Sequence, residues 1–146
     1  MRIRTRLIAI GALHTFLLVL LTSCSQSTPG PEVLPKSVAA ADETSAIQTL
    51  RTIASAQTQS KVMKGSYGDF NALSQAGFLD ARFATTTPVQ RGYRFTMTAS
   101  DAEFSVTADP VEATASARTR HLYLDSSDGV IHVNANRAAS RNDPAL

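Results

Sequence analysis

The chain of 146 residues contains a single cysteine, Cys24, in the stretch LLVLLTSCSQS at residues 17–27. A thiol can attack a substrate, pair with another cysteine or carry a covalent group. A disulfide would have to join two chains, because the sequence has no second cysteine. A catalytic thiol would need a positioned base, and the segment around Cys24 offers none. The chemistry that remains is covalent attachment.

The residues before Cys24 have the pattern of an export signal. Arg2, Arg4 and Arg6 precede the apolar run LIAIGALHTFLLVLL at residues 7–21. This run is shorter than the roughly 20 apolar residues that a membrane-spanning helix needs. We therefore expect residues 1–23 to be a signal peptide, with a retained transmembrane helix as the alternative.

The end of this run, Leu21-Thr22-Ser23-Cys24, resembles the lipobox of bacterial lipoproteins. In that family the thiol receives a diacylglyceryl group, the signal is cut just before the cysteine, and the new amine is usually acylated. The resemblance implies fatty acyl chains such as palmitate on Cys24 and a periplasmic position in the cell envelope. Two or three chains make a lasting anchor, since each buried methylene contributes about 0.8 kcal/mol. Ordinary signal cleavage, with Cys24 incidental, is the alternative.

The net charge of the chain argues against nucleic acid as a partner, and Ser25 indicates which membrane the protein is attached to. Removing residues 1–23 leaves a formal net charge of −1, so the pI near 9.0 of the whole sequence does not indicate a nucleic-acid surface. Ser25 follows the cysteine where aspartate would favour retention, which under the proteobacterial sorting rule favours the outer membrane. We expect no nucleic-acid partner.

Two histidines suggest metal binding only weakly. His121 and His132 flank a predicted hairpin with Asp125 nearby, but the spacing provides no third ligand. We expect packing or solvated histidines. Surface charges are expected at Asp101, Glu103, Asp109 and Glu112. No phosphate-binding loop, G-x-S-x-G or H-E-x-x-H motif occurs, so we expect no catalytic residue, metal or cofactor and no enzyme.

The order of predicted elements indicates an α+β fold. Residues 24–41 are rich in proline and polar residues and are expected to form an extended tether. The spacing then predicts a long helix from Asp42, as its cap, to Lys64, with a more solvated second half. A short helix near residues 70–76, with Asp69 as a cap, leads to three or four antiparallel strands. The domain is expected at 42–134 and a flexible tail at 135–146.

Several blocks of this domain resemble type IV pilin-like proteins, and in particular pilins and the pseudopilins of type II secretion. The blocks are ETSAIQTLRTI (43–53), AQ (56–57), YG (67–68), GYRF (92–95), VTADP (106–110), RHLY (120–123) and DGVI (128–131). The resemblance implies a pilin-like headgroup, in which one long helix packs on the sheet. Calcium sites in some pseudopilin hairpins prompt a similar reading of Asp125, Asp128 and the Ser126 and Ser127 carbonyls. That loop has fewer ligands than calcium prefers, so we expect a capped turn and leave calcium binding open.

The chain departs from pilins at its N-terminal side. Pilins have a prepilin cleavage motif followed directly by a hydrophobic assembly helix, whereas here the lipobox and the proline-rich segment occupy that place. We therefore expect a non-catalytic envelope lipoprotein that binds proteins, with pilus or secretion components as possible partners. The alternative is a periplasmic ligand-binding lipoprotein unrelated to pili.

Overall fold

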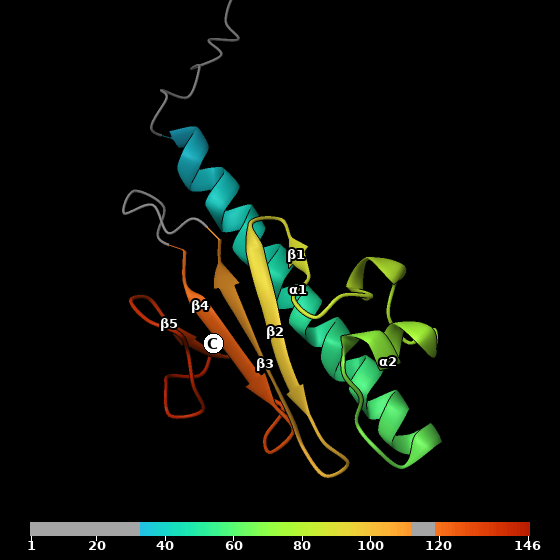
Figure 1. Cartoon of the computed structure of the whole chain (residues 1–146). Coiled ribbons are helices and arrows are strands. Elements are labelled where there is room, and N and C mark those ends of the chain that lie inside the picture. The colour runs from blue at the N-terminus through green and yellow to red at the C-terminus, as the bar shows by residue number, and fades with distance from the viewer. Residues whose placement is uncertain (1–32, 112–118) are drawn as a thin grey trace, which may run out of the picture.

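The computed structural model describes residues 33–111 and 119–146, and it describes side chains from Val38 onward (Figure 1). The predicted signal peptide, Cys24, the first part of the expected tether and Glu112 lie outside the described residues. No helix among the described residues is long and apolar enough to cross a membrane.

The long helix α1 runs from Val33 to Lys64, so it begins nine residues before the predicted start at Asp42. The prediction that the extended tether continues to residue 41 is therefore wrong. Pro35 is tolerated because it lies in the first turn, where backbone N–H groups have no partner within the helix. The alanines at 39–41 then favour continuation of the helix. Asp42 consequently lies inside α1 instead of capping it.

The apolar stripe of α1 packs on the sheet as predicted, and its second half is also buried in part. Leu50 and Ile53 are fully buried, but so is Gln57 at 0% exposure. The Gln57 amide donates to the Gly68 carbonyl at 2.7 Å and accepts from the Gly68 N–H at 3.0 Å. A polar residue therefore continues the buried face, because the loop after the helix satisfies its hydrogen bonds.

The connection after α1 follows the predicted pattern closely. Gly65, with φ of 81°, ends the helix in the left-handed conformation that favours glycine. Helix α2 then spans Phe70–Gln75, and the Asp69 carboxylate caps it by accepting from the Ala72 N–H at 2.7 Å. A single 3₁₀ turn, η1, covers Ala81–Phe83. The Phe70 and Phe83 rings lie 6.0 Å apart and extend the core beyond the sheet.

The sheet is antiparallel throughout, and its five strands follow chain order. They are β1 (Val89–Gln90), β2 (Tyr93–Ala99), β3 (Phe104–Pro110), β4 (His121–Asp125) and β5 (His132–Asn134). The α+β class is confirmed, but the sheet has five strands instead of three or four. The additional strand, β1, has two residues, which is too short to produce a detectable alternation.

Alternation along the strands separates an apolar inner face, which packs against α1, from a polar outer face. The inner face carries Tyr93, Phe95, Met97, Phe104, Val106, Ala108, Leu122 and Leu124, all of which belong to or pack against the core cluster. Figure 1 shows α1 lying diagonally along this side, with α2 beside its C-terminal half. The last residues of the chain lie at the β5 edge of the sheet.

Residues 135–146, predicted to be a flexible tail, are held against the domain. The Val133 N–H donates to the Pro144 carbonyl at 2.9 Å, and the Leu146 N–H donates to the Ile131 carbonyl at 2.8 Å. An isolated antiparallel bridge joins His132 to Ala145. Hydrophobic periodicity could not predict that this segment packs against the domain, because backbone hydrogen bonds and polar side chains hold it in place. We call residues 135–146 the C-terminal segment.

Candidate functional site

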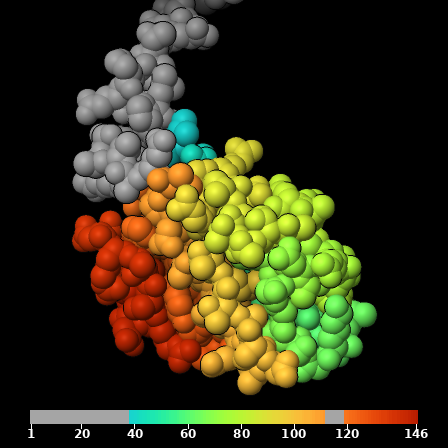
Figure 2. Space-filling view, viewed as in Figure 1, coloured from blue at the N-terminus to red at the C-terminus, as the bar shows by residue number. Residues whose placement is uncertain are grey.

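The outer face of the sheet carries a group of interacting polar side chains. In the view of Figure 2 the sheet covers most of α1, so the visible face is the outer one, with the C-terminal segment in red at its side. The strand register arranges its side chains in rows across the strands. The rows are Arg94, Asp109, His121 and Asn134; Thr96, Thr107, Tyr123 and His132; and Thr98, Ser105 and Asp125.

The first row contains a histidine–carboxylate pair. His121 Nδ1 lies 2.6 Å from Asp109 Oδ1, and both side chains are partly exposed. Asp109 was predicted to be a surface charge; it is partly exposed, and the strand register brings it beside His121. Arg94 is opposite Asp109 on β2 and is exposed.

Asp125 is a buried carboxylate at the end of β4, with a side chain 2% exposed. It accepts from the Tyr123 hydroxyl at 2.9 Å, from the Ser127 N–H at 2.8 Å and hydroxyl at 2.6 Å, and from Arg141 Nε at 2.8 Å. Burial by itself would raise the pKa of Asp125. The hydrogen bonds from Ser127, Arg141 and Tyr123 outweigh burial and hold this pKa well below its usual range.

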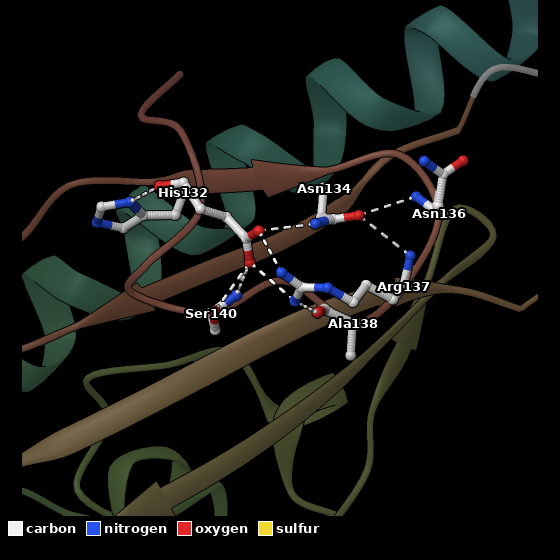
Figure 3. Close-up of polar contacts among 7 residues, drawn as sticks. His132, Asn134, Asn136, Arg137, Ala138 and Ser140 are labelled. Carbon is white, nitrogen blue, oxygen red and sulfur yellow. Dashed lines mark hydrogen bonds and ion pairs between the residues drawn. The ribbon is translucent and has the colours of Figure 1, made fainter.

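A second carboxylate, Asp143, organises the C-terminal segment (Figure 3). It accepts from Asn134 Nδ2 at 2.7 Å, from Arg137 Nη2 at 2.7 Å, and from the Ser140 N–H and hydroxyl at 2.8 and 2.9 Å. The bond from Asn134, helped by those from Ser140 and Arg137, lowers the pKa of Asp143 to about 2 against the opposing effect of burial.

His132 joins the turn after β4 to the same segment. Its Nδ1 lies 2.8 Å from the Asp143 carbonyl oxygen, and its Nε2 lies 3.1 Å from Asp128 Oδ2. The bond to the Asp143 carbonyl, followed by the bond to Asp128, raises the pKa of His132. The Val130 N–H, followed by His132, lowers the pKa of Asp128.

Glu43 connects α1 to Arg120, the residue that precedes β4. Its carboxylate accepts from the Arg120 N–H at 3.3 Å, from Nε at 3.0 Å and from Nη2. The Tyr93 hydroxyl donates to the Arg120 carbonyl at 3.1 Å. Burial, and then the nearby Glu43 charge, raise the pKa of Tyr93. Glu43 lies well past the first turn of α1, which begins at Val33.

The residues considered for metal binding are therefore divided among separate pairs. His121 contacts Asp109, His132 contacts Asp128, and Asp125 contacts Arg141. Within residues 33–111 and 119–146, no three histidine, cysteine or acidic side chains form a group that could hold a metal ion. In the DSSDG turn, the Asp125 carbonyl accepts from the Gly129 N–H at 3.2 Å, and both of its carboxylate oxygens already have donors.

Sequence reasoning missed the contribution of Arg137, Arg141 and Asp143. Their segment has no hydrophobic period, and the only available signal is the concentration of charges within residues 137–143. Asp101 and Glu103 are exposed, as predicted for surface charges.

These pairs predict a stability maximum at mildly acidic pH. The pKa values of Asp125, Asp128 and Asp143 are lowered from the unfolded value of about 3.9. Their contribution to the free energy of unfolding is therefore fully present above that pH. It should be lost as the pH falls through the folded values, which for Asp143 is about 2. The pKa of His132 is raised, so its contribution exists below about pH 6.5 and is lost as the pH rises through the folded value.

Urea denaturation between pH 2 and 9 measures this profile. The free energy of unfolding should be highest between about pH 4 and 6.5. His132→Gln should reduce the decline on the alkaline side and leave the decline at acidic pH. An alkaline decline of the same size in this variant would contradict the role given to His132.

A separate shallow groove lies between α1 and the turn that precedes β5. Its volume is about 320 Å³, and it is lined by Arg51, Ala54, Leu124, Gly129, Val130, Ile131 and Leu146. Val130 and Leu146 are 38% and 50% exposed. Arg51 is exposed, and no ion pair within the described residues involves it. The groove combines aliphatic walls with one positive charge.

A scan against models of known protein families found no match, and searches of curated proteins and of solved structures found none either.

Proposed function

We propose that this chain is a non-catalytic lipoprotein of the bacterial cell envelope, with a pilin-like domain that binds other envelope proteins. A lipid on Cys24 would hold it on the periplasmic side, and Ser25 favours the outer membrane. The observation that carries the proposal is the long helix on an antiparallel sheet directly after a lipobox-like sequence. Helix α1 begins nine residues after Cys24, so its first residue would lie within about 30 Å of the anchor.

The outer face is the proposed contact surface. Most of its charged side chains are ordered by partners within the chain, among them the pairs Asp109–His121 and Asp125–Arg141. Binding through ordered groups loses less side-chain entropy than binding through free ones. The hydrogen-bond donors and acceptors on the outer face would make such a contact specific for a partner with complementary groups.

Components of a type IV pilus or of a type II secretion system are the proposed partners. Support comes from the pilin-like sequence blocks together with the arrangement of α1 and the sheet. Assembly into a fibre through a hydrophobic N-terminal helix is not part of the proposal, because the lipobox occupies that position.

A cross-linked pull-down from solubilised envelopes tests this function. Pilus or secretion components should be recovered with the wild-type chain and at least about fivefold less with Thr107→Arg, which introduces a large charged group in the middle of the outer face. The matched control is Thr52→Arg, at an exposed position of α1. Equal recovery with both variants, or no recovery with the wild type, would count against the proposal.

The groove next to Arg51 favours one alternative, a periplasmic ligand-binding lipoprotein. Its aliphatic walls and single cation suit a small carboxylate with an aliphatic chain. Under this alternative, octanoate should bind to the wild-type chain in a calorimetric titration, and Arg51→Gln should abolish binding. Arg82→Gln, a substitution of an exposed arginine outside the groove, should leave it unchanged. Absence of octanoate binding would remove the support for this alternative.

A further inference from the structure

His132 has a hydrogen-bond acceptor on each side of its ring. Its Nδ1 lies 2.8 Å from the Asp143 carbonyl oxygen (Figure 3), and its Nε2 lies 3.1 Å from Asp128 Oδ2. A carbonyl and an ionised carboxylate cannot donate a hydrogen bond, so each contact requires an N–H on the ring. A neutral imidazole has one N–H, whereas an imidazolium has two. The geometry therefore fits the protonated ring of His132.

Asp128 supplies the negative charge that His132 contacts directly. Its Oδ1 accepts from the Val130 N–H at 2.9 Å, and this bond, followed by His132, holds the pKa of Asp128 below its usual range. Asp128 is thus ionised at neutral pH, and the proton between the two side chains belongs to His132. The other titratable or charged groups around the ring lie on β4 and the C-terminal segment, and they are Tyr123, Asp125 with its partner Arg141, and Asp143 with its partner Arg137.

Loss of one proton leaves His132 with a single N–H for two acceptors. A hydrogen bond to an ionised acceptor is stronger than one to a neutral acceptor, so the remaining proton belongs on Nε2, next to Asp128. Nδ1 then presents a lone pair to the Asp143 carbonyl oxygen, 2.8 Å away. These two atoms repel each other, and the strain falls on the peptide group between Asp143 and Pro144.

Residues 144–146 are the part of the C-terminal segment that can move in response. The Val133 N–H donates to the Pro144 carbonyl, and the Leu146 N–H donates to the Ile131 carbonyl. Residues 144–146 are all exposed, so little buried apolar surface opposes their departure from the sheet. Local opening at this end therefore has a low free-energy cost.

The part of the segment before residue 144 is held independently of His132. The Asp143 carboxylate accepts from Asn134 Nδ2, from Arg137 Nη2 and from the Ser140 hydroxyl. These bonds do not involve the imidazole, so they persist when His132 loses a proton. Opening is thereby confined to residues 144–146.

We propose that His132 is a proton-dependent latch for residues 144–146. The protonated ring holds these residues beside β5, and the neutral ring releases them. Release frees the Val133 N–H and the Ile131 carbonyl, so this edge of the sheet becomes a template for another strand. It also removes Leu146 from the wall of the groove next to Arg51. The proposal does not depend on the lipid anchor or on the outer-face partner.

The direction of the pH dependence follows from the surroundings of His132. The bonds to the Asp143 carbonyl and to Asp128 raise the pKa of His132 above its ordinary value of about 6.5. The proton is therefore bound at acidic pH and is lost as the pH rises through this higher value. The latch is closed on the acidic side and open on the alkaline side.

Hydrogen exchange measures the release in the full chain with Cys24→Ala, kept in detergent. The reporters are the Val133 and Leu146 N–H groups, each given as a protection factor, the intrinsic exchange rate at that pH divided by the measured rate. Between about pH 5.5 and about pH 8.5, both protection factors should fall at least about tenfold, because a hydrogen bond from a charged donor is lost. The Phe95 N–H, which donates to the Pro88 carbonyl at the other edge, should change less than about twofold. Equal changes at the two edges, or constant protection at Val133 and Leu146, would overturn the proposal.

Asp128→Asn distinguishes a latch from a merely structural contact. Because Oδ1 accepts from Val130, an asparagine that keeps this bond presents its amide NH₂ group to His132 Nε2. The neutral ring then accepts at Nε2 and donates from Nδ1 to the Asp143 carbonyl. Residues 144–146 should consequently stay protected at pH 8.5 in this variant, whereas loss of a structural ion pair would lower protection at both pH values.

Asp101→Asn is the matched control, since it neutralises an exposed carboxylate in the hairpin turn between β2 and β3. It should release residues 144–146 at alkaline pH as the parent chain does. Release by Asp128→Asn to the same extent as by this control would contradict the latch.

Nitrogen-15 spectra of the His132 ring give a second, independent measurement. Both ring nitrogens should carry a proton at about pH 5.5, and Nε2 alone should carry one at about pH 8.5. The midpoint of this change should coincide with the midpoint of the fall in protection at Val133. A neutral ring at pH 5.5, a proton on Nδ1 at pH 8.5, or midpoints more than about one pH unit apart would overturn the proposal.

Discussion

Replacing Cys24 with alanine is expected to abolish incorporation of labelled palmitate into this protein. The wild-type chain, produced in a bacterium that processes lipoproteins, should incorporate the label and fractionate with membranes. Without the thiol, the diacylglyceryl group has no attachment point, so the label and the cleavage before residue 24 should both be lost. Fluorography and immunoblotting of membrane fractions measure label, cleavage and location in one experiment.

Ser25→Ala is the matched control for this experiment, because it changes the neighbouring residue and keeps the thiol. It should incorporate palmitate as the wild type does. Label retained by Cys24→Ala would show that the acyl group is attached elsewhere, and the lipoprotein assignment would then be wrong.

Replacing Asp125 with alanine is expected to lower the free energy of unfolding by about 3 kcal/mol. The carboxylate is almost fully buried and accepts hydrogen bonds from Tyr123, Ser127 and Arg141. Its removal leaves buried donors without an acceptor in the turn after β4. The cost stays at the lower end of the range for broken buried pairs, because Arg141 is 55% exposed and can return to water. Urea denaturation at pH 6 measures the change.

Two further variants separate the contributions to this effect. Arg141→Ala should cost only about 1 kcal/mol, because Asp125 keeps its bonds from Tyr123 and Ser127. Asp101→Ala removes an exposed carboxylate without an ion pair and should change stability by less than about 0.5 kcal/mol. If Asp125→Ala were no more destabilising than Asp101→Ala, the central role of this carboxylate would be refuted.

The consequence of these bonds is that the C-terminal segment is part of the domain. Asp125 binds Arg141, and Asp143 binds Asn134 at the end of β5. Asp125 and Arg141 are 16 residues apart in the sequence, and Asn134 and Asp143 are nine residues apart. A periodic pattern cannot reveal such pairs, since it reports only which side of an element is apolar.

Gln57 illustrates the same limit inside a predicted helix. By its type it belongs on a solvated face, and the second half of α1 was expected to be more solvated for that reason. The loop at Gly68 supplies both a donor and an acceptor, so burial costs little. Only the tertiary position of that loop determines whether the amide can be buried.

The sequence by itself determined the α+β class, most of the core and the two faces of the sheet. The alternation in YRFTMTA assigns Tyr93 and Phe95 to the core, where both are buried, because a strand turns successive side chains to opposite sides. The sequence also determined where α2 begins, since Asp69 supplies the cap locally.

The tertiary structure alone decided which carboxylates pair with which bases and which edge of the sheet is covered. The C-terminal segment covers the edge at β5 and leaves the edge at β2 open beyond Phe95. These features depend on contacts between residues distant in sequence, and their free energies depend on burial that exists only after the chain has folded.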